Sequence, residues 1–243
     1  MNRTQRFALV ATGLGLFMIF LDALIVNVAL PAIQLDFAVG EAGLQWVVAS
    51  YSLGMAVFIM SAATLADRYG RRRWYLMGIA LFTLGSVACG LAPTMEVLNV
   101  ARGVQGLGAA TVNVTSLALI SAAFPDRKQK ARAIGIWTAI ASIGTAVGPT
   151  LGGLLVEQWG WRSIFLVNVP VGALVVLLTL GFLTESRSER AHSFDLPGQA
   201  LFIVAVGAFV YAVIEGPQAG WVSAPIISTA DDGCDWLLHL RLV

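Results

Sequence analysis

Seven long runs of apolar residues, bounded by charges, prolines or glycines, follow one another along the chain. A helix needs roughly 20 apolar residues to cross the hydrocarbon layer of a membrane, which is about 30 Å thick. The runs approach or exceed this length, so the pattern predicts seven transmembrane helices and an all-α integral membrane protein. The predicted spans are 7–30, 44–66, 74–91, 97–124, 133–156, 163–183 and 199–215.

The spacing of these runs also predicts how the chain is divided. Residues 1–184 are expected to form a six-helix bundle, and residues 185–198 a cytoplasmic loop that leads into the seventh helix at 199–215. The first run is too long for a signal peptide and contains Asp22, so we expect it to be retained. Residues 216–243 are expected to be an outer loop and then an aberrant tail, because the sequence after Ser228 turns acidic and leaves no room for a span.

The short loops between the runs alternate in charge, which predicts the orientation of the chain. Twelve of the fifteen basic residues fall on one side and only Arg162 on the other. By the positive-inside rule, the amino terminus and the loops after the second, fourth and sixth spans are cytoplasmic, in a multi-pass protein of the cell (plasma or inner) membrane. The twelve are Arg3, Arg6, Arg68, Arg71, Arg72, Arg73, Arg127, Lys128, Lys130, Arg132, Arg187 and Arg190.

Composition narrows the classes of function. The chain is 58% hydrophobic and 12% charged, a balance that a water-soluble domain of this length could not bury, so its main partner is the lipid bilayer. A net charge of +1 gives no reason to expect a nucleic-acid partner. Cys89 is expected to pack within a span, and neither cysteine has the spacing of a metal site, so we expect no cofactor.

Two charged residues lie inside predicted spans. Asp22 and Arg102 would each cost on the order of 3 kcal/mol or more if they faced lipid, so each is expected to face a cavity or a partner within the bundle. A carboxyl group in such surroundings can take up a proton near neutral pH, whereas an arginine stays charged. Asp22 is therefore a candidate for proton coupling and cation recognition, and Arg102 for tuning it. The alternative is that both only fix helices through hydrogen bonds.

The fourth span places polar and small residues on one helical face. Arg102, Gln105, Gly106 and Ala109 are spaced by three or four residues, which brings them to the same side. Gln105 and Asn113 of this span, and Asn27 of the first, are candidates to line a substrate cavity. The alternative for a single asparagine is a hydrogen bond between helices.

The fifth span carries a tandem glycine pattern. Gly144, Gly148 and Gly152 repeat every four residues and make a groove for close helix packing, and Gly153 extends it. Pro149 removes a backbone donor in the middle of this groove, which favours a bend. Such grooves also occur in purely structural helix pairs.

The loop between the second and third spans reads LADRYGRRR. Asp67 could cap a helix or bind nearby basic groups, and Gly70 would allow the tight reversal that so short a loop needs. The arginines, including Arg71, fit an ordinary positive-inside anchor as well.

Together these stretches resemble the major facilitator superfamily, and within it the drug:proton antiporters with fourteen spans. The resemblance rests on six motifs in order over residues 7 to about 221. Two of them depart from the family pattern, with Leu24 where a threonine is usual and Ala63 in place of a glycine. The motifs are LDALIVNVALP (21–31), AATLADRYGRRR (62–73), LNVARGVQGLGAA (98–110), GTAVGPTLGG (144–153), WRSIFLVNVPVG (161–172) and FDLPG (194–198).

The resemblance implies a fold and a function. The fold would be the N-terminal six-helix half of a major facilitator transporter plus one additional transmembrane helix. Asp22 and Arg102 would serve proton coupling, Asp67 with Arg71 a cytoplasmic gate, and Gly148 with Pro149 the bend of the fifth helix. The implied activity is multidrug efflux by proton-coupled antiport, driven by the proton gradient, with amphipathic or cationic small molecules as substrates.

Alternating access in this family needs two halves, and only one is expected here. Export therefore requires a C-terminal half, and a separately encoded half is one candidate partner. The alternative is a truncated, transport-inactive membrane fragment, such as a frameshift product, with at most an interaction role. A retinal-binding receptor is disfavoured because no lysine lies in the seventh span, and an enzyme because no nucleophile and base pair is evident.

Overall fold

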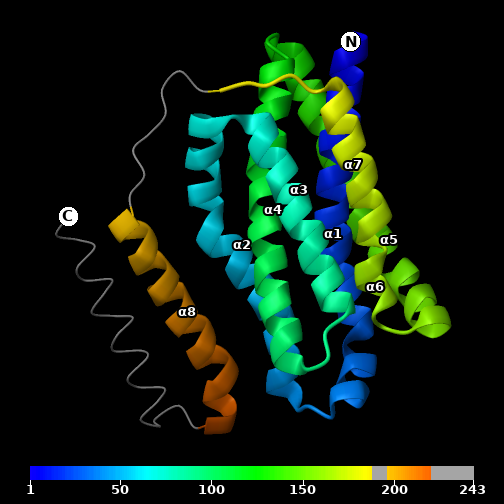
Figure 1. Cartoon of the computed structure of the whole chain (residues 1–243), viewed down its shortest axis with the longest axis vertical. Coiled ribbons are helices and arrows are strands. Elements are labelled where there is room, and N and C mark those ends of the chain that lie inside the picture. Colours follow the sequence, from blue (N-terminus) through cyan, green and yellow to red (C-terminus); the bar gives the residue numbers. More distant parts are fainter. Residues whose placement is uncertain (188–195, 220–243) are drawn as a thin grey trace.

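The computed structural model describes residues 1–187 and 196–219, and the described part is helical apart from short connections. Figure 1 shows α1 to α7 side by side in one bundle, with α8 next to α2. The helices are α1 (Arg3–Phe37), α2 (Glu41–Tyr69), α3 (Arg71–Gly90), α4 (Met95–Ala123), α5 (Arg127–Trp159), α6 (Ser163–Leu166), α7 (Asn168–Phe182) and α8 (Leu196–Ala219). The predicted all-α fold is confirmed.

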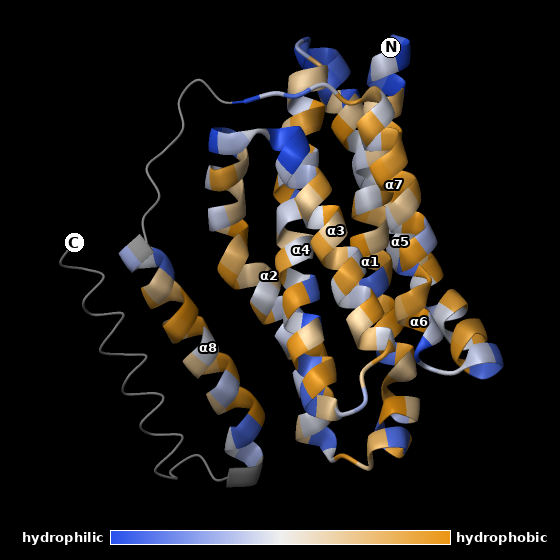
Figure 2. Cartoon of the chain, viewed as in Figure 1, coloured by the Kyte–Doolittle hydropathy of each residue, from blue (hydrophilic) through white to orange (hydrophobic). Residues whose placement is uncertain are grey.

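The chemistry of the helices matches a membrane environment. Six segments of the described chain are long and apolar enough to cross a membrane, namely α1, α2, α4, α5, α6 with α7, and α8. Helix α3 is not among them because it opens with three arginines, although it packs in the bundle like its neighbours. Figure 2 shows apolar residues along the sides of the bundle and hydrophilic residues mainly at its two ends.

Most helices run beyond the apolar segments that predicted them. The Asn2 side chain caps α1 by accepting a hydrogen bond from the backbone N–H of Gln5. The Asp126 side chain caps α5 by accepting one from the backbone N–H of Gln129. Polar caps satisfy the free N–H groups of a first turn, so the helices begin in their polar flanks. The predicted sixth span is two helices, because the helical conformation is interrupted at Val167 between α6 and α7.

Small residues bring the central helices together. The most extensive packing joins α1 with α5, and α4 with both α2 and α3. A Cβ atom on Gly106 would lie 3.0 Å from the Met55 backbone nitrogen, and one on Gly108 would lie 2.5 Å from the Phe82 nitrogen. These positions tolerate no side chain, so α4 is held against the backbones of α2 and α3. Close packing here sets the register of the buried polar groups.

Helix α8 is attached to α2 rather than packed into the bundle. The Trp46 indole donates a hydrogen bond of 2.9 Å to the Glu215 carboxylate, and its ring lies 6.4 Å from that of Tyr211. The Gln199 amide also donates to the Val57 carbonyl. The apolar segment of α8 is otherwise almost entirely on the surface.

Candidate functional site

The two intramembrane charges predicted from the sequence meet in the interior of the bundle. Asp22 of α1 and Arg102 of α4 form an ion pair of 2.5 Å between Oδ2 and Nη1. Their side chains are 0% and 1% exposed. Each charge therefore faces a partner within the bundle, as the cost of exposing it to lipid predicts.

The other oxygen of the Asp22 carboxylate accepts hydrogen bonds from two amides. Gln105 Nε2 donates at 2.8 Å and Asn168 Nδ2 at 2.9 Å, both to Oδ1. Gln105 Oε1 accepts in turn from Arg102 Nη1 at 2.8 Å. All three side chains donate to the carboxylate, so each of its two oxygens has a hydrogen-bond partner.

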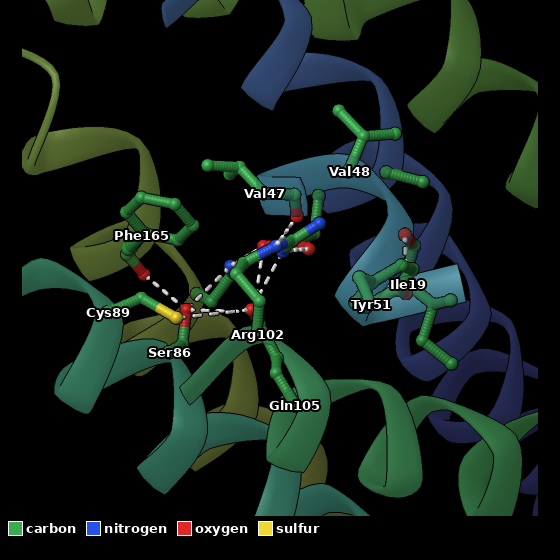
Figure 3. A network of polar contacts seen from close by, with 12 residues as sticks. Ile19, Val47, Val48, Tyr51, Ser86, Cys89, Arg102, Gln105 and Phe165 are labelled. Atoms are coloured by element: carbon green, nitrogen blue, oxygen red, sulfur yellow. Dashed lines mark hydrogen bonds and ion pairs between the residues drawn. The ribbon is translucent and has the colours of Figure 1, made fainter. Parts of the chain in front are cut away.

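The guanidinium group of Arg102 is fixed by α2 as well. Its Nε donates to the Val47 carbonyl at 3.2 Å, and its carbon lies 4.3 Å from the centre of the Tyr51 ring. The ring of Phe165 is 5.7 Å away on another side. Figure 3 shows the guanidinium between α2 on one side and α3 with Phe165 on the other. A cation held by an ion pair, a carbonyl and two ring faces has little freedom to move.

A second layer orients the two amides. Ser86 of α3 accepts from Asn168 Nδ2 at 2.9 Å and from Gln105 Nε2 at 3.2 Å, and donates to the Phe165 carbonyl at 2.8 Å. Cys89 lies one turn further along α3, where its Sγ is 3.7 Å from Gln105 Oε1. The site thus joins α1, α2, α3, α4 and the α6–α7 junction.

Two of the predicted cavity residues lie away from this network. Asn27 is exposed, and its side-chain amide donates to carbonyls of its own helix, those of Ala23 and Leu24, at 3.4 Å each. Asn113 is half-buried on α4. Gln105 is fully buried and contacts Asp22 and Arg102 directly.

The predicted gate residues gather at the end of the bundle that carries the amino terminus. Asp67 and Arg71 form an ion pair of 2.7 Å across one turn, and Gly70 between them has φ 117°, a conformation that favours glycine. The Glu185 carboxylate accepts from the backbone N–H groups of Arg72 at 2.9 Å and Arg73 at 3.2 Å. It therefore caps α3 and ties the segment after α7 to the α2–α3 turn.

The glycines of the fifth span pack against α1. A Cβ atom on Gly144 would lie 2.7 Å from the Phe17 carbonyl oxygen, and those on Gly148 and Gly152 would also contact α1. Gly153 points away, since a Cβ there would have nothing within 4 Å. Helix α5 continues through Pro149 without interruption.

Several residues that contribute to the site or to the α2–α3 turn were not predicted from the sequence. Asn168 and Ser86 are single polar residues inside apolar runs, a weak signal that becomes informative only when both prove to be fully buried. Tyr51 and Glu185 gave no signal, because an aromatic ring in a span and a carboxylate in a loop are ordinary. Among the described residues, no group of three His, Cys, Asp or Glu side chains could hold a metal ion.

The arrangement has a simple chemical consequence. In the described part of the chain, the hydrogen-bond partners of the Asp22 carboxylate are all donors, and the strongest is the charged Arg102. A proton or a cationic ligand that reaches Asp22 would compete directly with this guanidinium.

Comparison with known proteins identifies the family. The sequence model described as Major Facilitator Superfamily matches residues 12–229. The chain belongs to this superfamily. The family predicted from the motifs is therefore confirmed, and its members are transporters, not enzymes.

Curated relatives within the superfamily include drug exporters. The chain is 77% identical to the multidrug resistance protein Stp of Mycobacterium tuberculosis (strain CDC 1551 / Oshkosh), over 99% of this chain and 45% of that protein. It is 52% identical to the drug efflux pump JefA of the same strain, over 94% of this chain and 46% of that protein. The chain thus spans just under half the length of these relatives.

Solved transporter structures share the fold. A bacterial homologue of the human lysosomal transporter Spinster, in an inward-facing and occupied conformation, matches with a TM-score of 0.70 and 20% identity, over 96% of this chain and 57% of that one. The POT family transporter PepTSo matches with a TM-score of 0.66 and 14% identity, over 97% and 52%. The predicted fold, about half of a major facilitator transporter, is confirmed by these matches.

Proposed function

We propose that this chain supplies the N-terminal half of a proton-coupled multidrug exporter, in which Asp22 carries the exchanged proton. The observation that supports this most strongly is the buried ion pair between Asp22 and Arg102. Ionisable groups deep in a membrane bundle are costly and usually serve a pathway for ions or substrate. The drug exporters among the relatives agree with this function.

Proton coupling follows from competition at one carboxylate. When Asp22 is ionised, Arg102 and two amides hold it in the closed arrangement seen here. Protonation removes the charge that attracts Arg102, so the pair loosens and α1 can move relative to α4. A cationic substrate near Asp22 favours the ionised form and releases the proton. Exchange of substrate for proton is the result.

The substrates that fit this scheme are amphipathic or cationic small molecules. Asn27 and the half-buried Asn113 lie outside the buried network, where polar groups among apolar walls can meet a substrate. The fold matches of about half a transporter agree with a second half facing these helices. A C-terminal partner half is therefore part of the proposal.

The orientation and the moving parts complete the proposal. The basic loops lie on the cytoplasmic side of the cell membrane, with the amino terminus inside. The Asp67–Arg71 pair, with Gly70, serves as the cytoplasmic gate, because an ion pair at a helix junction can open and close with the state of the bundle. The α1–α5 contact along Gly144, Gly148 and Gly152, next to Pro149 and Gly153, lets α5 bend as α1 moves.

The test uses this chain continued by the C-terminal portion of the Stp relative, a fusion named the completed transporter. A fluorescent cationic dye is added outside everted membrane vesicles, and an imposed pH gradient with an acidic lumen drives its uptake. We expect Asp22→Asn to abolish gradient-driven transport. The matched control is Asp36→Asn, a carboxylate on the same helix that is 43% exposed and should leave transport intact.

Three outcomes contradict the proposal. Equal gradient dependence in the wild type and Asp22→Asn would show that another group carries the proton. Dye transport by this chain alone would show that no second half is needed. An inactive completed transporter that still inserts and folds would favour the alternative of a transport-inactive fragment.

A further inference from the structure

A cavity at the α2–α3 turn combines positive charge with an apolar wall. Its volume is about 200 Å³. It lies at the end of the bundle that carries the amino terminus, where the chain reverses from α2 into α3 (Figure 1). The lining residues are Arg68, Tyr69, Arg73, Trp74, Met77 and Arg187.

Two of the three arginines that line this cavity have no ion pair within the part of the chain that the structure describes. Within residues 1–187 and 196–219, neither Arg68 nor Arg187 takes part in an ion pair. Arg73 is 74% exposed and forms a long ion pair of 4.0 Å with Glu185, whose carboxylate also accepts from backbone N–H groups of α3. Among the described residues, three guanidinium groups thus line one space, and one carboxylate, Glu185, is in an ion pair with them. Such a space attracts an anion.

The wall of the cavity is what a lipid requires. Trp74 and Met77 follow Arg73 on α3, so they lie on the side toward the membrane interior. Met77 is 49% exposed, and Arg68 is held over the ring of its neighbour Tyr69 at 5.5 Å. Aromatic rings and arginines at this depth are typical of the membrane interface. A ligand that fills the cavity therefore has an anionic head and an apolar chain.

We propose that this cavity binds the phosphate headgroup of an anionic phospholipid, whose acyl chain descends past Met77. Arginine suits a phosphate because its planar fork donates two hydrogen bonds to it. Basic pockets between transmembrane helices on the cytoplasmic side bind anionic headgroups by this chemistry. The bound lipid would brace the α2–α3 turn next to the Asp67–Arg71 pair.

Native mass spectrometry of the purified chain, with phosphatidylglycerol or phosphatidylcholine added, tests this site. The pocket variant is Arg68→Gln/Arg73→Gln/Arg187→Gln. The matched control is Arg127→Gln/Lys128→Gln/Arg132→Gln, which removes the same charge from the start of α5 outside the cavity. We expect phosphatidylglycerol to bind the wild type and the control, and the pocket variant to lose at least tenfold in affinity.

A single substitution and a competing anion sharpen the test. Arg187→Gln alone, which changes no helix, should weaken binding by about fivefold even if the triple variant fails to fold. Equal losses in the pocket variant and the control would overturn the site, as would equal binding of phosphatidylcholine. Displacement of the lipid by equimolar inorganic phosphate would identify free phosphate as the ligand and overturn the lipid assignment.

Discussion

Removing Arg102 should destabilise the bundle far more than removing an exposed arginine. In Arg102→Leu, Asp22 stays at 0% exposure and loses its donor at 2.5 Å, while the amides of Gln105 and Asn168 remain. Breaking one side of a buried pair costs about 3–5 kcal/mol, mainly because an uncompensated charge stays behind. The exposed pair of Arg162 with Asp36, of similar length at 2.8 Å, should cost about 0–1 kcal/mol.

The measurement is the free energy of unfolding of the purified chain in mixed micelles of increasing dodecyl sulfate content. Adding Asp22→Asn to Arg102→Leu should regain about 2 kcal/mol, because a neutral amide needs no counter-charge. Arg162→Leu is the matched control. The reasoning is refuted if Arg102→Leu costs no more than Arg162→Leu, or if the second substitution restores nothing.

Other contacts within the bundle give three further predictions. Gly106→Val should cost about 1–3 kcal/mol because the new side chain meets the backbone of α2, whereas Gly135→Val, with open space around it, should cost less than 1 kcal/mol in the same unfolding assay. Glu185→Gln should speed hydrogen exchange in the first turn of α3 by about fivefold, because the charged cap of this helix is lost. Unchanged exchange would show that Glu185 does not stabilise this turn. Asn168→Leu should reduce pH-gradient-driven transport by the completed transporter about tenfold, whereas Thr179→Val on the same helix should not. Equal transport by the two variants would show that Asn168 is not part of the functional site.

The helices were predictable because the bilayer sets their length. Each predicted span overlaps an observed helix. A helix needs roughly 20 apolar residues to cross the bilayer, and the apolar runs of the sequence are about that long. Their ends were not predictable from hydropathy, because polar caps such as Asn2 and Asp126 start helices outside the apolar core. The break at Val167 was not predicted, although polar Asn168 follows it and Pro170, which has no backbone N–H, lies in the next turn.

The site was predictable only in part. Asp22 and Arg102 stood out because charge in lipid is expensive, yet nothing in the sequence showed that they meet. Their pairing depends on the register between α1 and α4, which close backbone contacts at positions such as Gly106 determine. Asn168 was missed because one asparagine in an apolar run does not indicate which helix it will face. The assignments of gate, bend and substrate contacts remain proposals.

Proton release on substrate binding tests the central claim most directly. The completed transporter is purified, transferred to lightly buffered detergent solution with a pH indicator, and mixed with a cationic substrate. If Asp22 exchanges its proton for the substrate, the wild type releases protons and Asp22→Asn releases none. Equal proton release from both proteins, with equal substrate binding, would contradict the account.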